Sequence, residues 1–172
     1  MTSHWNATED VKKLLAIEEI KKLRPHYCRA LDEKRFEEWR SIFTSNAKIL
    51  ALEVTDRAMP VGADAIIEWV RDVMEGAATA HHAHGAEITL LNDHEAVGIW
   101  ALEDNIFWPV ERPNTFGAKR RFRGFGHYHD KYILTATGWR ISEQLLTRVF
   151  VEVDGVGRAV ANRQDIDTTM QQ

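Results

Sequence analysis

Hydrophobic residues in the first part of the chain recur every three or four positions, which is the spacing of one face of an α-helix. The first such stripe consists of Ile17, Ile20, Leu23, Tyr27 and Leu31. Thr8, a typical N-cap residue, predicts where this helix begins, and Pro25 predicts a kink or a break within it. The pattern therefore indicates a long amphipathic helix with Tyr27 on its buried side.

Two further helical segments are expected before the pattern changes. A second, shorter helical face is formed by Phe36, Trp39, Ile42 and Phe43, and it leads into a turn at 44–46. A brief strand over 47–54 follows, and then a third helix over 64–74, for which Gly62 and Asp64 supply start signals.

From Thr79 onward, hydrophobic and polar residues alternate with the period of two that is typical of β-strands. The alternating stretches are 87–91, 96–108, 123–134 and 139–153. Short turn sequences at 92–95 and 135–138 join neighbouring stretches, so we expect antiparallel hairpins. Helices followed by a run of strands predict an α+β fold, a curved antiparallel sheet wrapped on three helices with a cavity between them.

Two segments lie outside this regular pattern. The stretch 110–121 contains Pro113, Asn114 and Gly117, and its length predicts a loop that serves as a lid or a subunit contact. The polar residues from 154 to 172 predict a tail that is disordered or used in assembly. We therefore expect one domain over 1–153 followed by this tail.

Composition narrows the class of protein. The chain has 172 residues with 44% hydrophobic and 28% charged residues, as in a soluble globular domain. Its net charge of −4 favours neither a nucleic acid nor a membrane surface as a partner. No stretch approaches the length of a membrane span, and the polar first residues do not resemble a signal peptide. The single Cys28 excludes an intramolecular disulfide and fits a reducing compartment, so a cytoplasmic location is expected.

Charged residues on otherwise apolar strand faces are the first chemical signal. Asp104 interrupts a row that consists of Gly98, Trp100, Leu102, Ile106 and Trp108. A buried carboxylate is costly unless it is paired. Arg148, which shares a predicted face with Leu146 and Phe150, is a candidate partner. The pair could equally brace the sheet or belong to a functional site.

Histidines form the second signal, because five of the eight lie in two short clusters. They are His81, His82, His84, His127 and His129. Two His-x-His pairs on strands could bind a metal, but no carboxylate stands at a convincing ligand spacing, and we expect no metal. The other reading is a general acid or base within a pocket, and alternation sends His81 to the face opposite His82 and His84.

The remaining candidates have two readings each. Asp32 could cap the helix that begins near Phe36, or it could orient a histidine. Arg120, Arg121 and Arg123 are either a solvated basic face or a site for an anionic part of a substrate. A phosphate-binding glycine loop and a serine nucleophile elbow are both missing from the sequence.

Four segments that follow one another along the chain, 27–32, 81–88, 98–104 and 126–132, together with Phe43 before a turn, resemble the SnoaL-like branch of the nuclear transport factor 2-like superfamily. The resemblance extends over about 17–153. It implies a cone-shaped curved sheet closed by three helices around a deep apolar pocket. Within the superfamily, the chain is most similar to bile acid 7α-dehydratases and, more distantly, to scytalone dehydratases.

The resemblance also implies a catalytic set. Carried over residue by residue, the dehydratase site falls on Tyr27, Asp32, His81, Asp104 and Arg148. Tyr27 would polarise a carbonyl, and His81, oriented by Asp32, would remove a proton and return it to the departing hydroxyl, with no cofactor. Two positions depart from the pattern: a pocket tyrosine falls near Ala51, and a second pocket histidine has no counterpart at 105–108.

The expected ligand is a small, apolar, polycyclic or steroid-like molecule. Residues expected to bind it are Trp100, Trp108, Tyr128, Asp130 and Phe150. The expected function is a cofactor-independent lyase that eliminates water from a hydroxy-ketone or hydroxy-enone. Alternatives are a ketosteroid-type isomerase with the same site, or a non-catalytic ligand-binding or assembly module, including the small subunit of a ring-hydroxylating dioxygenase. The resemblance further implies a homo-oligomer, a dimer or trimer.

Overall fold

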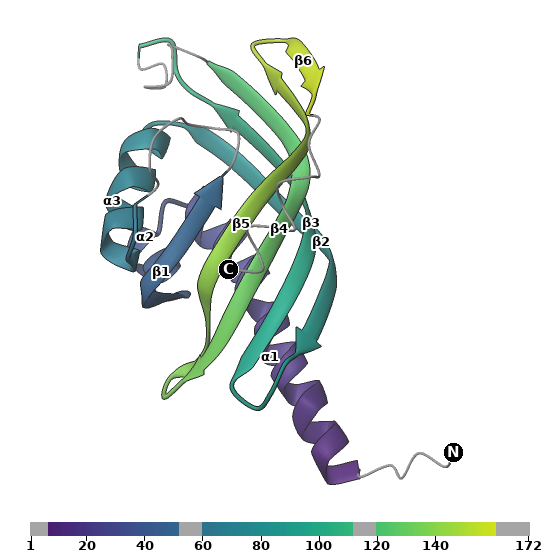
Figure 1. Cartoon of the computed structure of the whole chain (residues 1–172). Helices are drawn as coiled ribbons and strands as arrows, with labels where there is room; N and C mark the ends of the chain where they lie inside the picture. Colours follow the sequence, from purple (N-terminus) through teal and green to yellow (C-terminus); the bar gives the residue numbers. More distant parts are fainter. Residues whose placement is uncertain (1–6, 52–59, 112–119, 161–172) are drawn as a thin grey trace.

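Three helices and six strands make up the described part of the chain, which in this computed structural model comprises residues 7–51, 60–111 and 120–160 (Figure 1). The helices are α1 (Ala7–Asp32), α2 (Phe36–Arg40) and α3 (Ala63–Met74). The strands are β1 (Phe43–Ala51), β2 (Ala78–Leu90), β3 (Glu95–Phe107), β4 (Arg121–Thr135), β5 (Gly138–Val153) and β6 (Val156–Ala159). The predicted α+β class is confirmed.

The sheet has the strand order β1-β5-β4-β3-β2, and β6 also pairs with β5. The consecutive strands from β2 to β5 are antiparallel, as the turn sequences predicted. β1, however, runs parallel to β5, so the sheet is mixed and the fully antiparallel prediction is wrong at this edge. β1 and β5 are far apart in sequence and no hairpin turn joins them, so their parallel pairing could not be predicted from turn sequences. The polar tail begins with β6, and residues 161–172 lie outside the described part.

Helix α1 lies behind the strands in Figure 1 and packs mainly against β2. It continues through Pro25, so the predicted break does not occur. A proline inside a helix removes one backbone hydrogen bond, and Arg24 and Tyr27, buried on either side of Pro25, hold this turn of the helix in the core. α2 ends at Arg40, and Phe43 begins β1 instead of closing a helical face. The Ile141 amide bonds the Ile42 carbonyl and draws the chain into the sheet there.

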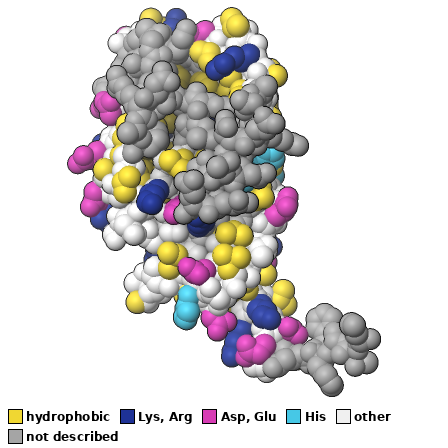
Figure 2. Space-filling model, viewed as in Figure 1, with side chains coloured by type: hydrophobic (Ala, Val, Ile, Leu, Met, Phe, Trp, Pro, Cys, Tyr) yellow, Lys and Arg dark blue, Asp and Glu magenta, His cyan; other side chains and the backbone are white. Residues whose placement is uncertain are grey.

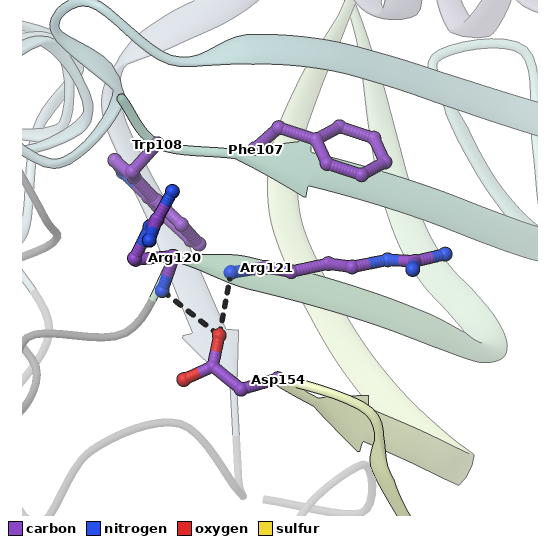
Figure 3. A pocket seen from close by; sticks show the side chains of 5 residues that line it. All are labelled: Phe107, Trp108, Arg120, Arg121 and Asp154. Carbon is purple, nitrogen blue, oxygen red and sulfur yellow. Dashed lines mark hydrogen bonds between the residues drawn. The ribbon is translucent and has the colours of Figure 1, made fainter. Parts of the chain in front are cut away.

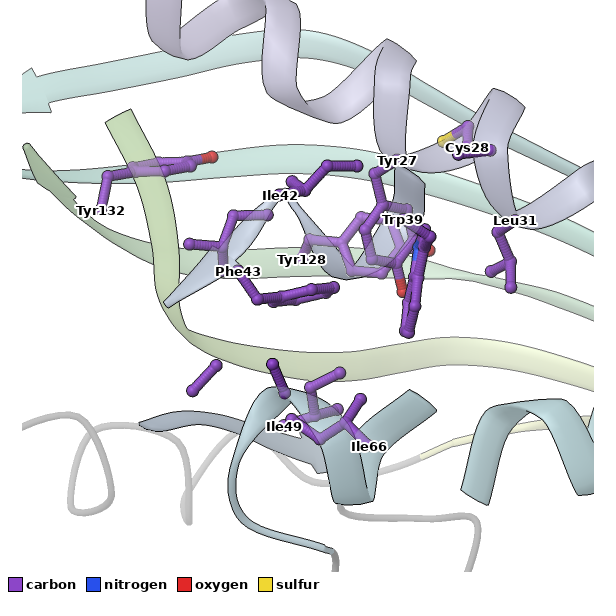
Figure 4. Packing of buried hydrophobic residues seen from close by; sticks show 14 of the residues in the cluster. Tyr27, Cys28, Leu31, Trp39, Ile42, Phe43, Ile49, Ile66, Tyr128 and Tyr132 are labelled. Atoms are coloured by element: carbon purple, nitrogen blue, oxygen red, sulfur yellow. The ribbon is translucent and has the colours of Figure 1, made fainter. Parts of the chain in front are cut away.

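A group of aromatic residues lies within the core between the helices and the inner face of the sheet (Figure 4). The Tyr27 ring lies 5.1 Å from Trp39, 5.9 Å from Phe43 and 5.8 Å from Tyr128, measured between ring centroids. A smaller cluster of Val73, Ala77, Ile106 and Trp108 lies at the end of α3. Figure 2 shows acidic and basic side chains interspersed on the surface in this view. None of the helices described here has the length and apolar character of a membrane span.

Candidate active site

Asp32 and His81 form a hydrogen-bonded dyad where the C-terminus of α1 meets β2. Oδ1 of Asp32 lies 2.6 Å from Nδ1 of His81, and Oδ2 accepts the backbone amide of His81 at 2.9 Å. The hydroxyl of Thr79 donates to Oδ1 at 2.9 Å. Burial opposes ionisation of Asp32, but the hydrogen bonds and charge of His81, with the Thr79 hydroxyl, outweigh it and lower the pKa of the carboxyl. The N-cap of α2 is Arg35, so Asp32 orients a histidine and does not cap that helix.

The hydrogen bond to Asp32 uses Nδ1 of His81 and leaves Nε2 available to contact a substrate. An ionised carboxylate can only accept hydrogen bonds, so Nδ1 is the donor and the neutral imidazole keeps its lone pair on Nε2. The His81 side chain is only 5% exposed, and that of Asp32 is 23% exposed. His81 pairs directly with Asp104 across β2 and β3, so the two side chains leave the sheet on the same face.

Asp104 is held by Arg148 in a two-bond ion pair. Nη1 and Nη2 of Arg148 donate to Oδ1 and Oδ2 of Asp104 at 2.8 and 2.7 Å. Both side chains are about 95% buried, with 4% and 5% of their surface exposed. The arginine crosses β4 above Gly124, where a Cβ atom would come within 2.6 Å of Asp104 Oδ1. The alternation pattern therefore identified a real pair, and Gly124 makes room for it.

Tyr27 lies within the aromatic core between α1 and the sheet, beside Trp39, Phe43 and Tyr128 (Figure 4). Its hydroxyl accepts a long hydrogen bond of 3.5 Å from Nε2 of Gln144. Burial raises the pKa of this phenol to about 12, so the hydroxyl keeps its proton at neutral pH. Tyr27 can therefore act as a donor, whereas a phenolate role is excluded there.

Phe150 does not share a face with Arg148, which corrects the sequence-based expectation. Gly126 pairs with Arg148 and Phe125 with Phe150, so Val149 is an extra residue in β5. Such a β-bulge inverts the alternation of side chains beyond it. The Phe150 ring consequently packs against Phe125 on the outer face, with 6.1 Å between ring centroids.

Asp130, predicted to contact a ligand, is instead part of the core. Its side chain has no exposed surface and is paired with the equally buried Arg24 of α1. Oδ2 of Asp130 also accepts the Tyr132 hydroxyl at 2.7 Å, and that hydroxyl accepts the Trp100 indole N–H at 2.9 Å. Trp100 is thus committed to the same buried network, while Tyr128 stacks under the Arg24 guanidinium at 3.9 Å.

Arg24 is a buried charged residue that was not predicted from the sequence. It lies four residues after Ile20 and three before Tyr27, on the buried stripe of α1. An arginine at that helical spacing within an apolar stripe is a readable signal of a buried cation. Burial alone would lower its pKa, but the Asp130 carboxylate and the nearby tyrosine oxygens outweigh it and raise the pKa.

Trp108 belongs to a separate place, at the far end of β3 (Figure 3). Its indole N–H donates to the Val73 carbonyl at 2.9 Å, and its ring borders a cavity of about 500 Å³. Arg120, Arg121, Phe107 and Asp154 complete the described lining. Arg123 is not part of this cavity lining and pairs with Glu103 at 3.2 Å. The loop prediction for 110–121 falls largely on 112–119, outside the described residues, as does the side chain of Ala51.

An open groove of about 330 Å³ borders the dyad between α1 and β2. Its lining comprises Pro25, Cys28, Arg29, Asp32, His81, His82, Ala83 and His84. His82 and His84 are exposed and stacked, with ring centroids 6.1 Å apart, on the face opposite His81. Within the described ranges, no three or more His, Cys, Asp or Glu side chains are arranged to hold a metal ion.

Comparisons with known proteins agree with this architecture. The family model of the SnoaL-like domain matches residues 12–144. A Novosphingobium aromaticivorans protein described provisionally as a scytalone dehydratase has a TM-score of 0.73 at 18% identity, over 90% of this chain and 97% of that one. A Kribbella flavida protein has a TM-score of 0.72 at 24% identity, over 81% and 95%. A type 2 hexachlorocyclohexane dehydrochlorinase has a TM-score of 0.70 at 13% identity, over 90% and 99%.

Proposed function

The chain belongs to the SnoaL-like domain family, and from that premise we propose that it is a cofactor-independent lyase acting on a small apolar hydroxy-ketone or hydroxy-enone. The observation that carries the proposal is the buried Asp32–His81 dyad, with its 2.6 Å hydrogen bond. It faces the same side of the sheet as the Asp104–Arg148 pair. The proposed base and a buried ion pair therefore face the same side of the sheet, and the carboxylate that orients the base lies beside them.

In the proposed reaction, Nε2 of His81 removes a proton from the carbon next to the substrate carbonyl. The C–H electrons form an enolate, which Tyr27 stabilises by donating its hydroxyl proton as a hydrogen bond. The enolate then expels the hydroxyl group on the adjacent carbon, and the His81 imidazolium protonates it as it leaves. One C–H and one C–O bond break, a C=C bond forms, and water departs.

Asp32 supports each step through its contact with Nδ1. It holds the imidazole in the tautomer that presents a free lone pair at Nε2, and its negative charge stabilises the imidazolium formed in the first step. Positioned proton transfer of this kind contributes about 10²–10⁴-fold in rate. The Asp104–Arg148 pair is neutral as a unit and would give the substrate a polar edge to align against.

Two of the related folds bear names that denote eliminations, a dehydratase and a dehydrochlorinase. This supports a site built for proton removal and departure of a leaving group. The isomerase alternative needs the same base and differs only in where the proton is returned. It is therefore treated as an outcome of the test.

The test incubates the protein in D₂O with a panel of β-hydroxy ketones and hydroxysteroid enones, and follows loss of water and deuterium uptake by mass spectrometry. Loss of water that falls by about 10²-fold or more in His81→Gln and Asp32→Asn supports the lyase. His94→Gln, which replaces an exposed histidine in the turn between β2 and β3, is the matched control and should retain activity.

Other outcomes separate the alternatives. Deuterium uptake at carbon without loss of water, sensitive to His81→Gln, would indicate an isomerase. Neither water loss nor deuterium uptake, together with a ligand-induced rise in melting temperature, would indicate a binding module and would overturn the proposal.

A further inference from the structure

A lysine is linked to the dyad through the Thr79 hydroxyl. Nζ of Lys34 is 2.7 Å from the Thr79 hydroxyl oxygen and 3.4 Å from the Leu31 carbonyl oxygen. The Thr79 hydroxyl is in turn 2.9 Å from Oδ1 of Asp32, the oxygen that meets His81. Four polar groups thus form a continuous chain from an ammonium to an imidazole.

The direction of every hydrogen bond in this chain is determined by chemistry. An ammonium can only donate, so Thr79 accepts from Lys34 and has its single proton left for Asp32. An ionised carboxylate can only accept, so Nδ1 of His81 must carry a proton. The lysine at one end therefore directs the Thr79 proton onto Oδ1 of Asp32, the same oxygen that meets Nδ1 of His81.

The backbone at Lys34 gives an independent reason to look for a role. Its φ of 58° is in the left-handed region, which is costly for a residue with a Cβ atom. Arg35 N bonds Ala30 O and Lys34 N bonds Leu31 O, so Lys34 occupies the helix-terminal position where glycine is usual. A strained residue that persists beside a reactive dyad points to a function for its side chain.

The electrostatic setting agrees with a tuning role. Partial burial lowers the pKa of Lys34, although the charge of Asp32 opposes this. Other titratable groups close to the dyad are Cys28 and Arg29 on α1, His82 and His84 on β2, and Asp104 on β3. None of these five groups hydrogen-bonds the Asp32 carboxylate, whereas Thr79 links Lys34 to it.

We propose that Lys34, acting through Thr79, is a positioning residue that holds the Asp32 carboxylate against Nδ1 of His81 and lowers the base strength of that histidine. The inference rests on the proposed function for its catalytic meaning, but the hydrogen-bond chain can be tested without turnover. Removing the lysine charge should favour the protonated imidazole, because one positive charge no longer opposes another.

The test measures the His81 ring nitrogens by ¹⁵N NMR over a pH series in the full chain. Lys34→Met should move the His81 titration midpoint up by roughly half a pH unit, the Coulomb effect expected in water of one charge within about 8 Å. Thr79→Val, which removes the hydroxyl that donates to Oδ1 of Asp32, should shift it in the same direction. Thr79→Ser, which keeps the hydroxyl, should behave as wild type, and so should Lys22→Met, which removes an exposed charge from α1.

Lys34→Gly separates this role from a structural one. Relief of the left-handed strain should raise the melting temperature by about 2–4 °C, while the His81 midpoint rises as in Lys34→Met. An unchanged His81 midpoint in Lys34→Met, Thr79→Val and Lys34→Gly would overturn the inference, whatever the melting temperature of the glycine variant.

Kinetics gives the second readout. Where the wild type turns over a substrate, the acid limb of kcat/KM should move up by the same amount in Lys34→Met, about 3-fold lower activity one pH unit below the midpoint. A shifted NMR titration in a protein that turns over nothing would support the inference and refute the lyase. Lyase activity in the wild type, together with a His81 titration that does not shift in Lys34→Met, would support the lyase and refute the inference about Lys34.

Discussion

The ion pair between Arg24 and Asp130 should be one of the largest single contributions to holding α1 against the sheet. Neither side chain has any exposed surface. Arg24 also donates to Gln144 Oε1 at 3.0 Å, and Asp130 accepts the Tyr132 hydroxyl at 2.7 Å. Replacing either partner alone leaves the other as an unpaired buried charge.

The expected cost follows from that burial. Breaking a buried pair from one side costs about 3–5 kcal/mol, out of a total stability of about 5–15 kcal/mol. For a chain of this length, this is roughly a 6–20 °C fall in melting temperature. Arg24→Met and Asp130→Asn should each show a loss of this size.

The double variant is the sharper measurement, because it removes both charges while the asparagine can still accept the Tyr132 hydroxyl. Its destabilisation in urea unfolding should fall short of the sum of the single losses by roughly 2–3 kcal/mol. Lys21→Met, which breaks the exposed pair with Glu18, should cost less than about 1 kcal/mol. Additive single losses, or losses no larger than that of the exposed pair, would refute a buried ion pair as a stabilising unit.

Three further predictions follow from the site. Gly124→Ala should force Asp104 and Arg148 apart and cost about 3 kcal/mol in urea unfolding, with little added loss when Arg148→Met is already present. Because folding lowers the pKa of Asp32, its ionisation stabilises the fold at pH values above the unfolded-state pKa of about 3.9. This contribution is lost as the pH falls through the lower pKa of the folded state. Asp32→Asn should therefore flatten the acid limb of unfolding free energy against pH, and an unchanged limb would contradict this. Burial raises the pKa of the Cys28 thiol to about 11, so its alkylation by iodoacetamide at pH 7 should be at least about 100-fold slower than that of a peptide thiol, and equal rates would contradict this.

Most helices and strands could be predicted from the local periodicity of hydrophobic residues. The stripes of α1 and α3 and the alternation in β3, β4 and β5 depend on neighbours within one element, so a single sequence reveals them. The range 87–91 expected for β2 was too short, although the alternation from Thr79 already indicated extended chain before it. Ala78–His84 is rich in alanine and histidine and has weak strand propensity. Its pairing with β3 is what makes it a strand, and that pairing is a property of the tertiary structure.

The same distinction explains the site. Asp104 and Arg148 were predictable as a pair because alternation places both on the inner face. Phe150 was misplaced because the bulge at Val149 adds one residue to β5, and no glycine or proline marks it in the sequence. The choice between the two roles of Asp32 depended on a contact across 49 residues, which spacing within a helix cannot reveal.

The two buried ion pairs also divide the inner face of the sheet between stability and chemistry. Asp130 pairs with Gly98 on β3, and Asp104 lies six residues further along that strand, about 20 Å away. At the Asp130 end, the Arg24 guanidinium covers Tyr128, and Trp100 is bonded into the same network, so the core fills that region. The Asp104 end carries His81 and Arg148, and the cation lies 5.1 Å from the Phe122 ring. In the proposed site a ligand reaches the dyad from the Asp104 end or from the groove between α1 and β2, so substitutions there should alter substrate choice, while those around Asp130 should alter stability.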